Sequence, residues 1–113
     1  MEISFILTYD ELFTLATAAT ELSQAGEHFL RDALPDAQKC SLDGLVDKKM
    51  AHYVGDKIEL SPVIRMIADA IAKADTVVLS NGNWIIQSSW IKLKCEKYPF
   101  QDNCFKVVPL KEK

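Results

Sequence analysis

The dipeptide Asn81-Gly82, set between two apolar runs, constrains the fold of this chain more than any other feature of its sequence. Asn-Gly is the strongest short-range signal for a two-residue β-hairpin turn, because glycine and asparagine tolerate the positive φ angles that such turns need. The flanking runs, TVVLS and WIIQS, are rich in the β-branched and aromatic residues that favour strands. We therefore expect a β-hairpin at this position.

The sequence that follows extends this hairpin into an antiparallel meander. In WIKLKCEKY, Ile91, Leu93 and Cys95 alternate with charged residues, as a strand with one buried face requires. A turn within residues 99–103 then leads to a last apolar run, CFKVVPL. The meander therefore has one face exposed to solvent.

The three cysteines, Cys40, Cys95 and Cys104, are odd in number and lack C-x-x-C spacing, which argues against a zinc site or a disulfide framework. Buried thiols are the default interpretation. A two-residue turn centred on Pro99 and Phe100 would place Cys95 opposite Cys104, so a redox pair stays open as an alternative, although disulfides are rare inside cells.

The N-terminal part of the chain carries helix signals. A β-prone run at Ile3–Leu7 is followed by Thr8, which precedes Glu11 at capping-box spacing, so we expect a helix from Tyr9. Gly26 is expected to end this helix, because glycine inside a helix costs about 1 kcal/mol relative to alanine.

Two prolines divide the rest of the helical region. A second helix is expected over Glu27–Leu34, and Pro35 stops it because the ring clashes with a preceding helical residue. A third helix, capped by Asp36, should follow. The clearest helix start is Ser61-Pro62, since serine accepts a hydrogen bond from a free amide and proline gives up an amide that had no partner.

Between the third and fourth helices, Gly55-Asp56 predicts a second, small hairpin over residues 51–60. Helices followed by a hairpin give the element order of a winged helix. The predicted fold class is α+β, with a winged-helix-like helical part of about four helices and a small hairpin, followed by a C-terminal antiparallel β meander. We expect a single domain over 1–113, with the helical part in 1–74 and the meander in 75–110.

Composition and charge narrow the classes of function. The 113 residues are 49% hydrophobic and 26% charged, which is typical of a folded domain. The net charge of −3 disfavours nucleic acid as a partner, because few cations remain to neutralise phosphates. The sequence has no apolar run long enough to span a membrane and no basic signal segment, so we expect a cytoplasmic protein without a membrane partner.

The sequence carries no motif of recognisable catalytic chemistry. His28 and His52 lack metal-ligand spacing, and carboxylates four residues apart, such as Asp43 and Asp47, are typical of solvated helix faces. A catalytic pair of Cys40 with His52 would need an activated thiol and an orienting group, for which the sequence gives no signal. We predict no enzyme activity, no cofactor and no metal site.

Aromatic residues gather in the meander. Trp84, Trp90, Tyr98 and Phe100 lie in or beside its strands, and aromatic side chains are enriched at protein interfaces as well as in cores. Core packing is the simpler interpretation. Binding of a protein partner is the alternative for these four residues, and an exposed sheet edge would also allow a homo-oligomer.

Three segments resemble the N-terminal part of EspG-like proteins, which are associated with type VII secretion in Gram-positive bacteria. They are LTYDEL at residues 7–12, SLDGLVDKKMAHYVGDKIELSPVI at residues 41–64, and a helix leading into TVVLS. The resemblance covers about residues 3–80. It implies a cytosolic chaperone for secreted helical substrates.

The sequence therefore predicts a non-enzymatic protein-interaction module, which the resemblance makes a chaperone-like protein linked to secretion. The alternative is a winged-helix DNA-binding transcriptional regulator. Acids and bases balance in the third-helix region, which argues against entry into a DNA groove. The three basic residues of this region are Lys39, Lys48 and Lys49, and its three acidic residues are Asp36, Asp43 and Asp47. A small enzyme, the third class, would need a pocket that gathers a histidine with a thiol or acids.

Overall fold

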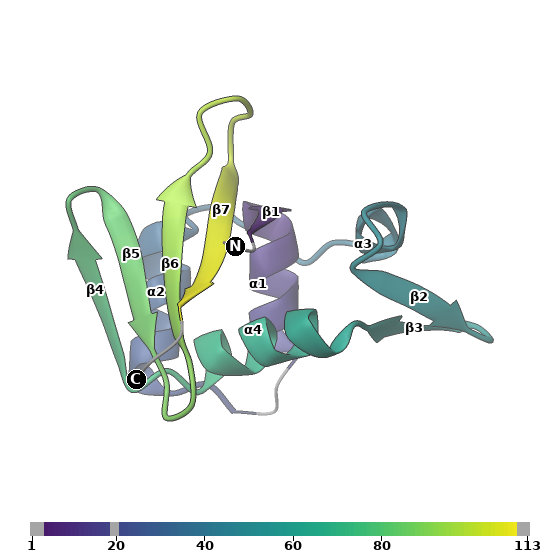
Figure 1. The fold of residues 1–113 in the computed structure, drawn as a ribbon, viewed down its shortest axis with the longest axis horizontal. Helices are drawn as coiled ribbons and strands as arrows, with labels where there is room; N and C mark the ends of the chain where they lie inside the picture. The colour runs from purple at the N-terminus through teal and green to yellow at the C-terminus, as the bar shows by residue number, and fades with distance from the viewer. Residues whose placement is uncertain (1–3, 19–20, 111–113) are drawn as a thin grey trace.

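The structure, a computed structural model, describes residues 4–18 and 21–110. Ile3 of the first predicted strand and residues 19–20 of the first predicted helix lie outside them. The described residues form an α+β fold with four helices, a five-stranded antiparallel sheet and a two-stranded sheet (Figure 1). None of these helices has the length and apolar character needed to cross a bilayer. The elements are β1 (Phe5–Thr8), α1 (Tyr9–Thr17), α2 (Gln24–Ala33), α3 (Asp43–Asp47), β2 (Ala51–Val54), β3 (Lys57–Leu60), α4 (Pro62–Ala72), β4 (Thr76–Ser80), β5 (Asn83–Gln87), β6 (Lys92–Lys97) and β7 (Cys104–Leu110).

The large sheet has the strand order β1-β7-β6-β5-β4, and every neighbouring pair is antiparallel. Strands β4 to β7 confirm the predicted meander. The Asn81-Gly82 turn joins β4 to β5 with φ angles of 54° and 82°. Strand β1 comes from the other end of the sequence and pairs with β7, so β1 and β4 are the two edges of the sheet.

Helices α1, α2 and α4 cover one face of this sheet (Figure 1). Helix α2 packs on β4, α4 contacts β5 and β6, and α1 lies against β1 and α4. The core between the layers includes Phe29, Ile67, Ile71, Leu93 and Val107, all fully buried. Each such side chain stabilises the fold by about 1.5–3 kcal/mol through removal of apolar surface from water.

The two strongest local signals of the helical part are confirmed. Strands β2 and β3 form the predicted hairpin over residues 51–60, with Gly55 at a φ of 64° in its turn. Helix α4 begins at Pro62, and the Ser61 hydroxyl accepts a hydrogen bond from the Ile64 N–H (3.4 Å).

The small hairpin projects away from the large sheet and packs on α3 (Figure 1). The Tyr53 hydroxyl donates a hydrogen bond to the Asp43 carboxylate (2.6 Å), and the Ser41 hydroxyl donates a second (2.7 Å). The hydrogen bond from Tyr53, followed by that from Ser41, holds the pKa of Asp43 below its ordinary value. Helix α3 and the hairpin are thereby joined by side chains as well as by chain connection.

The prediction that Gly26 ends the first helix is wrong. Gly26 lies in the first turn of α2, where its N–H donates to the Ser23 hydroxyl (3.0 Å), which in turn donates to the Ala74 carbonyl (2.7 Å). Glycine is needed here because a Cβ would lie 2.7 Å from the Ile71 carbonyl oxygen. The residue permits close approach of α2 and α4.

The prediction of a third helix capped by Asp36 is also wrong. Asp36 has a left-handed φ of 63°, and the segment after it binds α1 through main-chain groups. The Gln38 N–H donates to the Asp10 carboxylate (3.0 Å), and the Cys40 N–H donates to the hydroxyl of Thr14 (2.9 Å). These side chains compete with helix hydrogen bonds, so α3 forms only after this segment.

Gly26→Ala should lower the free energy of unfolding by about 1–3 kcal/mol, because the new methyl group would meet the main chain of α4 at Ile71. Helix propensity alone predicts the opposite sign, since alanine is favoured over glycine by up to about 1 kcal/mol. Urea denaturation measures the change. Gln24→Ala, an exposed position in the same turn, is the control and should alter stability by less than about 0.5 kcal/mol. A more stable Gly26→Ala variant would contradict the packing of α2 on α4.

Candidate protein-interaction edge

The four aromatic residues for which partner binding is the alternative interpretation do not form one surface. Trp84 faces the helices, where its ring packs edge-on against Phe29 with centroids 5.9 Å apart. Tyr98 and Phe100 contact each other in the β6–β7 connection (5.5 Å), and Phe100 is 84% exposed. Trp90 is exposed in the β5–β6 connection, at the other end of the sheet.

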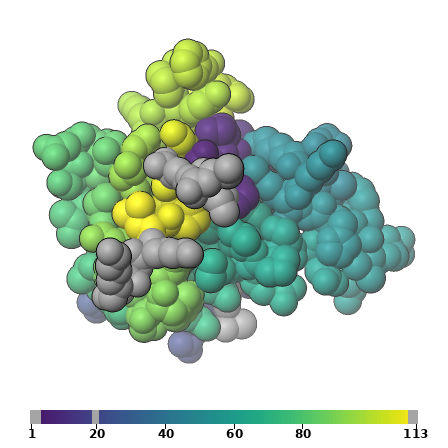
Figure 2. All heavy atoms as spheres, viewed as in Figure 1, coloured from purple at the N-terminus to yellow at the C-terminus, as the bar shows by residue number. Residues whose placement is uncertain are grey.

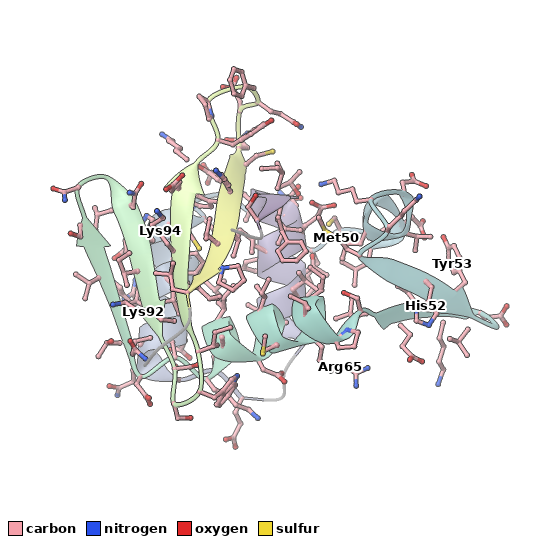
Figure 3. All side chains as sticks on the ribbon, in the orientation of Figure 1. Met50, His52, Tyr53, Arg65, Lys92 and Lys94 are labelled. Carbon is pink, nitrogen blue, oxygen red and sulfur yellow. The ribbon has the colours of Figure 1, made fainter. Side chains whose placement is uncertain are left out.

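The two histidines lie on separate elements, each beside one carboxylate. His28 Nδ1 is 3.0 Å from Asp32 on α2, and His52 Nε2 is 3.9 Å from Glu59 across the small hairpin. Figure 3 shows His52 on this hairpin, away from the large sheet. In the part of the chain that the structure describes, no three His, Cys, Asp or Glu side chains are grouped so as to hold a metal ion.

The two meander cysteines do not face each other. The register pairs Cys95 with Val107 and Cys104 with Thr8 of β1, so the arrangement that would have allowed a redox pair is not formed. The Tyr98 N–H donates to the Cys104 carbonyl (3.0 Å), and this bond closes the β6–β7 connection. Residues 99–103 lie between these two residues, so the connection is longer than a two-residue turn. All three thiols are free, and burial raises the pKa of Cys95 to about 12.

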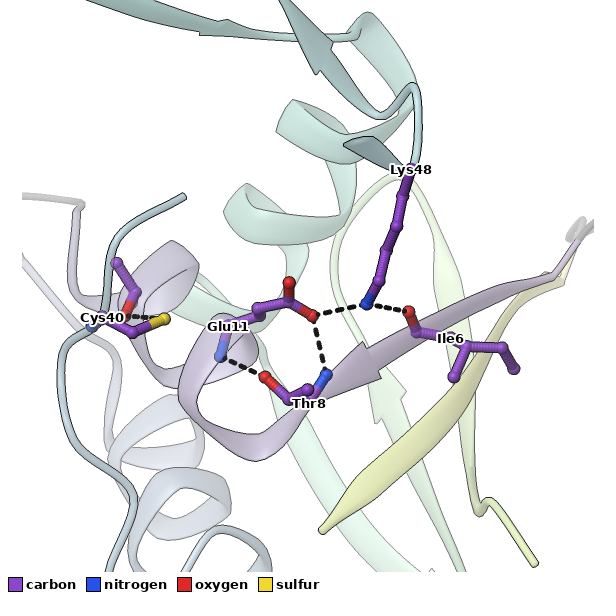
Figure 4. A network of polar contacts seen from close by, with 6 residues as sticks. Ile6, Thr8, Glu11, Cys40 and Lys48 are labelled. Atoms are coloured by element: carbon purple, nitrogen blue, oxygen red, sulfur yellow. Dashed lines mark hydrogen bonds and ion pairs between the residues drawn. The ribbon is translucent and has the colours of Figure 1, made fainter. Parts of the chain in front are cut away.

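A buried carboxylate closes the β1 edge of the sheet (Figure 4). The Glu11 side chain is 8% exposed and accepts hydrogen bonds from the Thr8 N–H and the Lys48 ammonium, both at 2.9 Å. The ammonium also donates to the Ile6 carbonyl (3.1 Å).

These bonds occupy the side of β1 that faces away from β7. Alternate residues of an antiparallel strand turn their main-chain groups away from the neighbouring strand. On β1 these residues are Ile6 and Thr8, because the Tyr9 N–H donates to the carbonyl of Asn103 on the β7 side. Lysine is a common means of blunting an edge strand, and a further strand could add to β1 only by breaking this network.

Among residues 4–18 and 21–110, no side chain closes the β4 edge in this way. Strand β4 is outermost on its side of the sheet, and the space-filling view places the β4–β5 hairpin, in green, at the margin of the molecule (Figures 1 and 2). Among the described residues, β5 is the only strand paired with β4. Val78 and Leu79 are 54% and 57% exposed. Natural edge strands are commonly protected by charge or proline, yet residues 76–87 contain neither.

Apolar side chains line both faces of this edge. Leu79 pairs with Trp84 and so lies on the helix side of the sheet, whereas Val78 pairs with Ile85 on the outer face. Trp84 is held in place by Phe29 beneath it. A strand added to β4 would therefore find apolar contacts above and below its main chain.

The charged residues of the sheet lie farther from β4. On the outer face, Lys92 and Lys94 project from β6 (Figure 3). The register places Glu96 of β6 and Lys106 of β7 on the same face. The Lys94 ammonium is 2.8 Å from Glu96, and its hydrogen bond is the main cause that lowers the pKa of Glu96. Strands β4 and β5 thus form the uncharged side of the sheet.

Comparison of the chain with protein-family models, with curated proteins and with solved structures gave no significant match.

The sequence analysis did not single out Val78 and Leu79, the exposed apolar residues of the β4 edge. A signal for them was present, because no side chain from Thr76 to Gln87 is charged. That signal becomes informative only when β4 is known to be an edge strand, and this depends on the pairing of β1 with β7.

Lys48→Met should lower the free energy of unfolding by about 1–3 kcal/mol, because it leaves the buried Glu11 carboxylate without its cationic partner. Urea denaturation measures the loss. The control is Lys49→Met, which removes the same charge from an exposed neighbour and should change stability by less than about 0.5 kcal/mol. Equal losses in the two variants would contradict the role of the network.

Proposed function

We propose that this chain is a non-enzymatic protein-interaction module that binds an extended segment of a partner protein along the β4 edge. The observation that supports this most directly is the difference between the two edges. On β1, the Ile6 carbonyl and the Thr8 N–H are bonded to side chains, and the described residues form no such bonds on β4. An uncovered edge strand offers a row of N–H and C=O groups to which another strand can add.

The proposed ligand is an extended segment with apolar side chains at alternate positions. Main-chain hydrogen bonds would supply affinity for any sequence, and side-chain contacts would provide selectivity. Leu79 offers an apolar contact on the helix side and Val78 offers one on the outer face, with Trp84 and Ile85 paired behind them on β5. A highly charged segment would be disfavoured, because no opposite charge lies on β4 or β5.

The positions of the histidines and thiols support a role without catalysis. Each histidine lies beside a carboxylate of its own helix or hairpin. Burial keeps the Cys95 thiol protonated, with a pKa of about 12. Covalent catalysis needs a nucleophile placed beside a base that activates it, and neither histidine pair includes a nucleophile.

We propose that the helical part, residues 1–74, is winged-helix-like, with the segment from Pro35 to Ser61 supplying its third helix and its wing. In this proposal, α3 and the β2–β3 hairpin form a scaffold at the start of α4, joined by the hydrogen bond from Tyr53 to Asp43. The proposed association with type VII secretion is based on the resemblance to EspG-like proteins. It would make the chain a cytoplasmic, chaperone-like protein whose bound partner is a secreted protein.

A winged-helix DNA-binding regulator is the alternative class, and the charges disfavour it. Helix α3 has five residues and carries Asp43 and Asp47, and the Lys48 ammonium after it is bound to Glu11. A regulator would bind duplex DNA with an affinity that falls steeply with salt. The proposed module would show no such binding.

A photo-crosslinking amino acid at position 79, in place of Leu79, should form an adduct with a partner protein in the native host. Mass spectrometry should map the adduct to an extended, apolar segment of that partner, because the probe lies beside the open main chain of β4. The control is the same probe at Val54, which is 51% exposed on the small hairpin and should give no matching adduct. Equal adducts from both positions, or none to another protein from position 79, would contradict the proposed function.

A further inference from the structure

The direction of hydrogen bonding along β4 follows from its turn. Both residues of the Asn81-Gly82 turn have positive φ, as in a two-residue type I′ hairpin, so Ser80 and Asn83 are the hydrogen-bonded pair that closes it. Bonded and non-bonded pairs alternate along an antiparallel ladder. Val77 and Leu79 therefore turn their N–H and C=O groups away from β5, toward the open side.

This pattern is complementary to itself about Val78. When a second copy lies antiparallel with Val78 opposite Val78, Val77 of each copy meets Leu79 of the other in a hydrogen-bonded pair. On the outer face, the Thr76 hydroxyl then lies opposite the Ser80 hydroxyl of the second copy. No charged residue occurs within β4, so the contact places no like charges together.

We propose that a second copy of this chain occupies the β4 edge when no other partner does, so that two sheets join across a two-fold axis at Val78. A contact of this kind uses the same patch on both copies and closes at two. Extension of the assembly through the β1 edge would require breaking the bonds that Lys48 and Glu11 make to the Ile6 carbonyl and the Thr8 N–H. This inference rests on the proposed function in one respect, which is that both use β4 as a binding edge.

The dimer should be weak and should dissociate on dilution. One pair of five-residue strands makes a small interface compared with those of stable complexes. Its apolar part comes from the exposed side chains of Val78 and Leu79. Weak self-pairing suits a binding edge, because it shields the strand from unspecific aggregation and still allows a partner segment to displace the second copy.

A charge swap at the proposed axis tests this register. Val78→Lys and Val78→Glu each place like charges opposite each other, so each variant alone should self-associate at least about tenfold more weakly than the wild type. An equal mixture of the two variants places lysine opposite glutamate and should recover the dimer. Sedimentation equilibrium over a range of concentrations measures association, and circular dichroism shows whether each variant is folded.

Val54→Lys and Val54→Glu are the matched controls, because Val54 is a similarly exposed valine outside the large sheet. They should leave self-association unchanged, both alone and mixed. A wild type that stays monomeric throughout would overturn the dimer, and so would self-association that Val78→Lys does not weaken. Failure of the mixture to recover the dimer would overturn the register.

The two proposals fail in different ways. A monomeric wild type whose probe at position 79 still cross-links a different protein overturns the dimer and supports the proposed function. Self-association with cross-links from position 79 only to a second copy of the chain supports the dimer and contradicts the proposed function.

Discussion

The buried Glu11 carboxylate is the interaction on which the arrangement of this molecule depends. It accepts from the Thr8 N–H at the end of β1 and from Lys48 just after α3, so it ties the sheet, α1 and the small hairpin to one point (Figure 4). Loss of one partner of a buried charge is costly. Lys48 therefore links the end of α3 to β1 and α1, and the same bonds occupy the Ile6 carbonyl and the Thr8 N–H at the β1 edge.

The β4 edge, on the opposite side of the sheet, is held by apolar packing. Among the described residues it has no polar network comparable to that of Glu11. Gly26 lets α2 approach α4 closely, and α2 in turn supports β4 from the helix side. Phe29 of α2 holds Trp84, which pairs with Leu79 at the edge. The strand is thus firmly placed while its outer side stays open. An uncharged edge strand with an open outer side is the feature on which the proposed binding of an extended chain is based.

Local chemistry made part of this fold predictable from sequence. The Asn81-Gly82 and Gly55-Asp56 turns and the Ser61-Pro62 helix start depend on residues next to one another, and all three are confirmed. The prediction of a third helix capped by Asp36 was wrong because side chains of α1, which are distant in sequence, bind the main chain after Asp36. Gly44 of α3 depends in the same way on a residue distant in sequence, because a Cβ there would lie 3.2 Å from the Glu11 carboxylate. Edge positions are equally non-local, since they follow from pairing between the first and last strands.

Amide hydrogen exchange, measured residue by residue by NMR on dilute protein, tests the difference between the two edges most directly. The Thr8 amide is bonded to buried Glu11 and should exchange slowly. The amides of Val77 and Leu79, which turn toward the open side of β4, should exchange nearly as fast as those of an unstructured chain. Slow exchange at Val77 and Leu79 together with fast exchange at Thr8 would contradict a closed β1 edge and an open β4 edge.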